Sequence, residues 1–154
     1  MNRRAILAVW ATAATAVPLA ALSHADPPYQ WQVVEFQSPD GNIHCHLIND
    51  HGKGIAACQI TDYTYAVPQP PGWCAAEVDA GRWFWGDILQ LEQGEQPFMQ
   101  CHGSSIGPGG QALDYGQTRS LLTMTCDSEP TGMTCTDSST GHYFRTSRES
   151  YDGG

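Results

Sequence analysis

The chain has 154 residues and carries 16 acidic against 7 basic side chains, which gives a formal net charge of -9. A chain this acidic is not expected to bind nucleic acid, because contacts to the phosphate backbone need a basic surface. Hydrophobic residues make up 41% of the chain, which excludes a disordered acidic tail. The length predicts one domain, since domains usually run to roughly 100–200 residues.

The first 25 residues have the pattern of a cleavable signal peptide. Arg3 and Arg4 precede the apolar stretch Ala5 to Leu22, and Ser23-His24-Ala25 then supplies small residues at the -3 and -1 positions of a cleavage site. An uncleaved membrane anchor is the alternative, because the stretch approaches the ~17–25 residues that span a bilayer. The small-residue exit favours cleavage. We therefore expect a secreted or cell-envelope protein with no membrane span after cleavage.

The remaining residues, 26–154, are predicted to form a single β domain with a net charge of -11, since cleavage removes two arginines and no acidic residue. Alternating apolar residues predict strands, and Gly, Pro, Asn and Asp clusters predict turns. In chain order we expect a strand over 33–37, a turn over 38–41, a hairpin with arms 42–48 and 55–60, and an ordered proline-containing loop over 61–73. One helical turn over 75–80, a strand over 83–92 and a short strand over 97–101 should follow. A mobile Gly- and Ser-rich stretch over 103–112 and a three-stranded meander in the last third complete the prediction.

The predicted fold class follows from this pattern. No long stripe with helical spacing is present, so the chain is expected to be mainly β. Hairpins followed by a C-terminal meander indicate a small antiparallel domain of barrel or sandwich type. Leu122, Met124 and Cys126 should share a face on one of the last strands, and Met133 and Cys135 should share a face on the next, by the two-residue period of a strand.

All six cysteines lie in the part predicted to be exported, and an even number in an oxidising environment indicates disulfides. Two cysteines lie on opposite arms of the predicted hairpin, two flank a turn that contains Pro130 and Gly132, and two remain. The preferred pairing is Cys45–Cys58, Cys74–Cys101 and Cys126–Cys135. A zinc site is the alternative, but the chain has no Cys-x-x-Cys pair.

His44 and His46 should lie on the face of their strand opposite to Cys45. Two imidazoles at this spacing can chelate a metal ion if a third ligand converges, with His51 and His102 as candidates. The alternative is two polar side chains on a solvated strand face. We favour that alternative, and we expect neither a metal nor another cofactor.

Aromatic residues are concentrated in the middle of the chain. Trp83 and Trp85 should share one face of the strand predicted there, with Phe84 on the other. Most aromatic residues of a small β domain pack in the core, but an exposed pair can stack on a sugar or anchor a protein partner. The candidate ligand-binding residues are Trp83, Trp85, Trp73 and His102.

No catalytic residue can be named from the sequence. The chain lacks a Gly-x-Ser-x-Gly nucleophile elbow and a phosphate-binding Gly-rich motif. Carboxylates that could serve a glycosidase, which needs two of them about 5–10 Å apart, are Asp87, Glu92, Glu95 and Asp114.

Several motifs carry a family resemblance. They are Phe-Gln-Ser-Pro-Asp-Gly-Asn-Ile-His-Cys over 36–45, Pro-Gly-Trp-Cys over 71–74, Cys-His-Gly over 101–103, Leu-Asp-Tyr-Gly over 113–116, Gly-Met-Thr-Cys over 132–135 and Gly-His-Tyr-Phe over 141–144. Together they resemble an exported actinobacterial family of unknown function, common in mycobacteria, over about 36–151. Asp40 stands where that family usually has Ser, and Ser104-Ser105 stand where Asp-Thr is expected. The resemblance implies an exported, disulfide-bonded domain and supplies no reaction.

These observations favour a non-catalytic binding or interaction module of the cell envelope or the extracellular space, with a glycan or a protein as its partner. The alternative is a small secreted hydrolase that acts on glycans through carboxylates and aromatic platforms. The two differ in geometry, because the hydrolase needs a pair of carboxylates in one pocket with Trp83 or Trp85.

Overall fold

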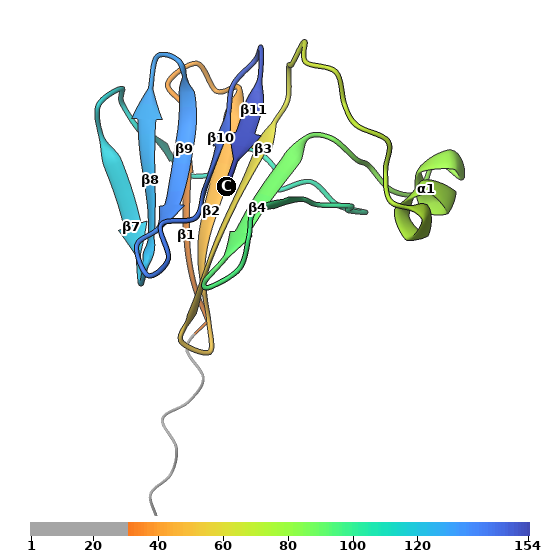
Figure 1. Ribbon diagram of the computed structural model, residues 1–154. Helices are drawn as coiled ribbons and strands as arrows, with labels where there is room; N and C mark the ends of the chain where they lie inside the picture. Colours follow the sequence, from red (N-terminus) through yellow and green to blue (C-terminus); the bar gives the residue numbers. More distant parts are fainter. Residues whose placement is uncertain (1–30) are drawn as a thin grey trace, which may run out of the picture.

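The computed structural model describes residues 31–154, so the predicted signal peptide lies outside the described residues (Figure 1). Eleven strands and one helix make up the described part. They are β1 (Gln32–Gln37), β2 (Ile43–Asp50), β3 (Lys53–Ile60), α1 (Gly72–Asp79), β4 (Ile88–Glu92), β5 (Phe98–Met99), β6 (Gln111–Ala112), β7 (Thr118–Leu121), β8 (Met124–Glu129), β9 (Gly132–Asp137), β10 (Tyr143–Thr146) and β11 (Tyr151–Gly153).

The strands form two sheets, which confirms the predicted mainly-β class with sandwich architecture. The first has the order β5-β4-β3-β2-β1-β6 and the second the order β11-β10-β9-β8-β7. All pairings are antiparallel except that of β1 with β6. The core cluster takes buried residues from both sheets, so the sheets pack face to face. None of the helices among residues 31–154 is long and apolar enough to cross a membrane.

The hairpin of β2 and β3 forms as predicted, with a tighter turn. His51 and Gly52 have φ angles of 51° and 85°, which suits the two-residue turns that match the twist of a hairpin. The resulting register places Cys45 directly opposite Cys58. The two cysteines are bonded, as predicted.

The C-terminal meander also forms, but it is only part of a larger sheet. β7 and β11 add a strand on each side of β8, β9 and β10, and neither was predicted. The placement of Leu122 on the face of Met124 is wrong. Leu122 has a φ of 54° and is half exposed, because it lies in the turn between β7 and β8.

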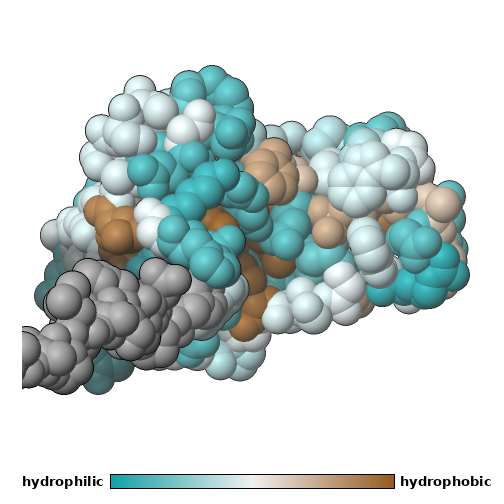
Figure 2. All heavy atoms as spheres, turned by 90° about the horizontal axis from the view of Figure 1, so that it is seen from below, coloured by the Kyte–Doolittle hydropathy of each residue, from teal (hydrophilic) through white to brown (hydrophobic). Residues whose placement is uncertain are grey.

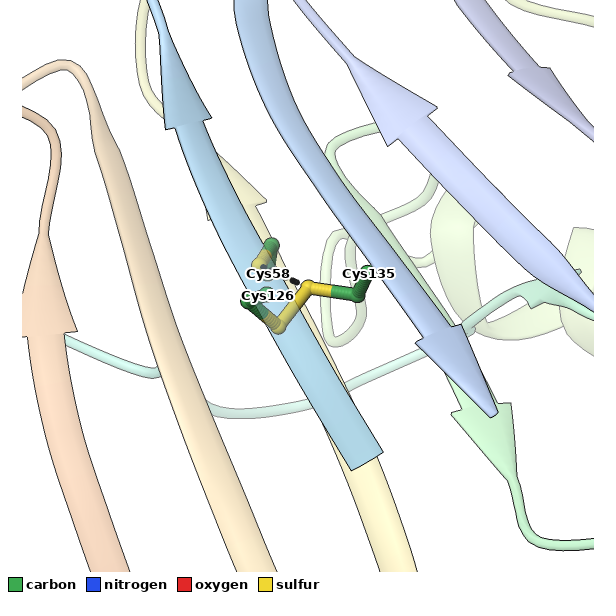
Figure 3. Close-up of side chains that lie close together, drawn as sticks. All are labelled: Cys58, Cys126 and Cys135. Atoms are coloured by element: carbon green, nitrogen blue, oxygen red, sulfur yellow. Dashed lines mark hydrogen bonds between the residues drawn. A yellow bond between two sulfur atoms is a disulfide. The ribbon is translucent and has the colours of Figure 1, made fainter. Parts of the chain in front are cut away.

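All three disulfides join the predicted partners, and no free cysteine remains among residues 31–154. Two of them face each other between the sheets, with 3.6 Å between the sulfur atoms of Cys58 and Cys135 (Figure 3). Cys126 completes a buried group of sulfurs that are close enough to hold a metal ion. All of these sulfurs are oxidised and offer no thiolate, so the group is part of the apolar core rather than a metal centre.

The third disulfide, Cys74–Cys101, ties α1 to the segment that follows β5. The helix begins at Gly72, directly after Pro71, and is longer than the single turn predicted over 75–80. Cys74 is its one buried residue. In Figure 1 the helix projects sideways from the sandwich, so this disulfide holds a peripheral element in place.

The strand predicted over 83–92 is shorter than expected, because β4 starts only at Ile88. Gly86 interrupts the extended chain with a φ of 106°, and a Cβ there would lie 2.5 Å from the side chain of Val67. Only Phe84, which forms an isolated bridge with His102, pairs with another segment in this region. The expected alternation of Trp83 and Trp85 against Phe84 on a strand is therefore wrong.

Candidate functional site

A cavity of about 760 Å³ opens on the face of the first sheet that points away from the core. Its floor follows from strand register. Gln37 of β1 is opposite His44 of β2, and His44 is opposite Gln59 of β3, so three adjacent strands present one row of polar side chains. All three residues line the cavity. Its volume lies within the ~300–1,000 Å³ of typical ligand sites.

Residues 103–112, which we call the strap, run along this cavity from the start of β4 to the edge of β1. The backbone N–H of Ile106 donates to the side-chain oxygen of Gln59 at 2.8 Å. At Gly110 the strap lies so close to β1 that a Cβ would be 2.1 Å from the backbone oxygen of Glu35. The composition of this stretch predicts mobility. Both of its ends are paired with other segments, through the Phe84–His102 bridge and the pairing of β6 with β1.

His44 and His46 point away from the cystine face, as the period predicts, but the expectation of a solvated face is wrong for His44. The residue is only 9% exposed, and its Nδ1 has no hydrogen-bond partner among residues 31–154. His46 lies 3.4 Å from Glu35. Burial lowers the pKa of His46, and the charge of Glu35 opposes that shift only in part.

The structure does not assemble the hypothetical histidine metal site. His51 lies in the turn at the far end of the hairpin, where it contacts Asp50. His102 is engaged with Asp87 and Ser104. Within residues 31–154, the oxidised cysteines are the only group of three metal-ligating side chains that converge.

Asp87 is the carboxylate of the cavity, and it is held from two sides. Its Oδ1 lies 2.8 Å from Nε2 of His102, and its Oδ2 accepts a hydrogen bond of 2.7 Å from the Gln59 amide. Nδ1 of His102 lies 2.9 Å from the backbone oxygen of Ser104, which can only accept. Both ring nitrogens of His102, a candidate ligand-binding residue, are therefore engaged within the protein.

Three aromatic side chains complete the lining, Tyr63, Phe84 and Trp85. Tyr63 stacks on Tyr65 with 4.5 Å between ring centroids. The indole N–H of Trp85 donates to the backbone oxygen of Pro68 at 2.9 Å. Phe84 is 57% exposed and stacks on the ring of His102. These contacts fix the aromatic rings before any ligand arrives.

The other two predicted tryptophans do not line the cavity. Trp73 and Trp83 pack edge to face with 6.4 Å between centroids, and they are 66% and 37% exposed. Figure 2, seen from below, shows hydrophobic residues separated by hydrophilic ones rather than one continuous apolar surface. Of the candidate residues, Trp85 alone contributes to the lining, while His102 supports it from behind Asp87.

The carboxylates considered for a hydrolase do not converge either. Glu92 pairs with Lys53 near the far end of β3 at 3.1 Å, and Glu95 is exposed in the turn after β4. Asp114 is exposed beyond β6. Among the described residues, Asp87 is the single carboxylate that lines the cavity.

The Ser-Pro-Asp-Gly-Asn motif has a structural role at one wall of the cavity. Ser38 accepts a hydrogen bond of 3.0 Å from the backbone of Ile43 and so closes the turn between β1 and β2. The side chain of Asn42 donates to and accepts from the backbone of Asp62, at 3.0 and 2.8 Å. The motif thereby fixes the end of the hairpin next to Gly41, which lines the cavity.

Sequence reasoning missed Gln37, Gln59 and Tyr63. The one signal that could have found the two glutamines is their register with His44, given that the strand pairing is known. No family model, no curated protein and no solved structure matches this chain.

Proposed function

We propose that this protein is a non-catalytic binding module of the cell envelope or extracellular space, and that the cavity over the first sheet is its ligand site. The observation that carries the proposal is the lining itself. The lining combines aromatic rings that are held by contacts within the protein and a few polar groups that point into the same cavity. This combination is typical of ligand sites. Such a cavity accommodates a small ligand or the exposed end of a larger glycan or protein.

Binding fits the site better than hydrolysis does. Glycosidases need two carboxyl groups, one on either side of the scissile bond, and Asp87 is the only carboxylate that the described part of the chain contributes to the cavity. His102, which contacts Asp87, has no free ring nitrogen, because both of its nitrogens lie against acceptors within the protein. A glycan-acting hydrolase therefore remains the second candidate, without an assembled catalytic pair to support it.

An extracellular location is supported by three disulfides, because such bonds persist in oxidising compartments. The signal-peptide pattern of residues 1–25 and the resemblance to an exported actinobacterial family point the same way. Both come from the sequence and belong to the proposal.

The test uses the tryptophans as matched variants. Purified chain 26–154 is titrated with soluble glycans and peptides of envelope origin, and backbone NMR shifts locate any binding. We expect shifts around Gln59 and the strap, with binding lost in Trp85→Ala and kept in Trp73→Ala. Loss in Trp73→Ala alone would move the site to the exposed tryptophan pair. Release of a cleaved glycan would instead favour the hydrolase.

A further inference from the structure

We infer that the cavity is built for an uncharged, polyhydroxylated ligand, such as a neutral sugar residue, rather than for an anionic or a cationic one. This inference rests on the proposed function and names the chemical class of its ligand. It follows from the charges that line the cavity, from the contacts that already engage Asp87 and from the hydrogen-bonding groups that remain.

The lining offers nothing to balance an anion. Among residues 31–154, no Lys or Arg lines the cavity. Three of the five basic residues of the described chain are paired with carboxylates elsewhere, Lys53 with Glu92, Arg82 with Glu77, and Arg148 with Asp62. Sulfates, phosphates and uronic acids would therefore lose hydration without gaining a cationic partner, beside the oxygens of Asp87.

A cation gains little, because both oxygens of Asp87 already have partners within the protein. Oδ1 lies 2.8 Å from Nε2 of His102, and Oδ2 accepts a hydrogen bond of 2.7 Å from the Gln59 amide. The His102 side chain is 4% exposed, and its Nδ1 lies 2.9 Å from the backbone oxygen of Ser104, so His102 is held in place against Asp87.

The hydrogen-bonding groups of the lining that are still available suit the hydroxyl groups of a ligand. The Asp87 side chain is 19% exposed and keeps acceptor capacity beyond its two hydrogen bonds. Gln37, Thr61 and Ser105 add uncharged donors and acceptors to the same lining. The rings of Tyr63 and Trp85 supply flat apolar surfaces against which the C–H face of a sugar can pack.

The test compares sugars that share a ring and differ in charge. Glucose, galactose and mannose are titrated into the chain beside their uronic acids and their 2-amino derivatives, and NMR shifts of the Gln59 and Trp85 side chains are followed. We expect at least one neutral hexose to bind about tenfold or more tightly than its charged derivatives. Tighter binding of a uronic acid or an amino sugar at the cavity would overturn the inference.

Two variants test the role of the contact between Asp87 and His102. His102→Gln removes the imidazole that faces Oδ1 of Asp87, so affinity for the 2-amino sugar should rise relative to the neutral sugar by about tenfold. Asp87→Asn, the matched control, removes the carboxylate and should not raise it. An unchanged ratio in a folded His102→Gln protein contradicts the role of this contact. If His102→Gln does not fold, the wild-type comparison still decides the inference.

The two levels of the proposal fail in different ways. If glycans or peptides bind at the cavity but every ligand found is charged, the ligand class is wrong and the binding function stands. If none of the glycans, peptides or sugars moves the cavity resonances, the proposed function fails together with the inference.

Discussion

The two faces of the first sheet are built from alternate residues of the same strands, yet they differ in every physical respect. The inner face carries Cys45, Leu47 and Cys58, which are buried against the second sheet. The outer face carries His44 and Gln59, which line an open cavity. One face is apolar and filled, and the other is polar and partly empty. Because the side chains of a strand alternate between its two faces, one hairpin contributes to the core with one face and to the proposed binding cavity with the other.

The largest expected change in the free energy of unfolding comes from a substitution on the inner face of β2, and the neighbouring residue on the outer face is its control. Leu47 is fully buried in the core, and Leu47→Ala should lower the free energy of unfolding by about 3–5 kcal/mol, through lost transfer energy and the cavity left behind. His46 lies on the outer face and is partly exposed, so His46→Ala should cost less than about 1 kcal/mol. Urea unfolding of both variants measures the difference. Equal losses would show that the outer face carries as much of the fold as the core.

The inner face could largely be predicted from the sequence, and the outer face could not. Cys45 and Cys58 are 13 positions apart in the sequence, and the turn between them contains Gly52. The pairing of the two cysteines and the face on which they lie therefore follow from the local sequence. The cavity depends instead on segments far apart in the chain. Gln59 meets Ile106 across 47 residues, and Asp87 meets His102 across 15. No local pattern encodes such contacts.

The same reasoning explains the errors of detail. Leu122 fits an alternating pattern but occupies a turn with positive φ. Trp83 and Trp85 fit one too, but Gly86 ends the extended chain before β4 begins. Tertiary contacts decide each of these positions.

A polar link between the sheets provides the second prediction. Asp137, at the end of β9, is fully buried. Burial by itself raises the pKa of the Asp137 carboxyl group, but hydrogen bonds from the backbone of Gly94 and from the backbone and hydroxyl of Ser139 outweigh it and hold the pKa well below its ordinary value. The carboxylate thus joins the turn after β4 to the turn after β9. Asp137→Asn should lower the free energy of unfolding near pH 7 by about 1–3 kcal/mol.

The pH dependence of stability shows in which direction the Asp137 carboxyl group acts. A carboxyl group whose pKa is depressed by folding contributes its full stability above the unfolded pKa, about 3.9, and loses it as the pH falls through the folded pKa. Wild type should therefore lose stability below about pH 4, and Asp137→Asn should lose less over the same range. Thermal unfolding from pH 7 to pH 2 compares the two slopes. Parallel curves would show that Asp137 is not the group responsible.

The smallest expected effect has the opposite sign and concerns the outer row. A buried polar atom without a partner typically costs about 1–3 kcal/mol, and Nδ1 of His44 is such an atom. His44→Leu removes it and should leave the midpoint of thermal unfolding unchanged or raise it by an amount equivalent to about 1 kcal/mol. Most substitutions of buried residues destabilise instead. A rise would indicate that His44 is retained for the cavity at the expense of stability.

The control is the next residue in the same row. Gln59 uses its amide for Asp87 and its oxygen for Ile106, so Gln59→Leu would leave both partners unsatisfied and should destabilise the fold by about 1–3 kcal/mol. If His44→Leu raises stability and Gln59→Leu lowers it, Gln59 is the residue that holds the cavity together, and His44 is one that the fold merely tolerates. If both variants destabilise equally, His44 is a structural residue of the outer face, and the division between the two faces of the sheet is less complete than the register indicates.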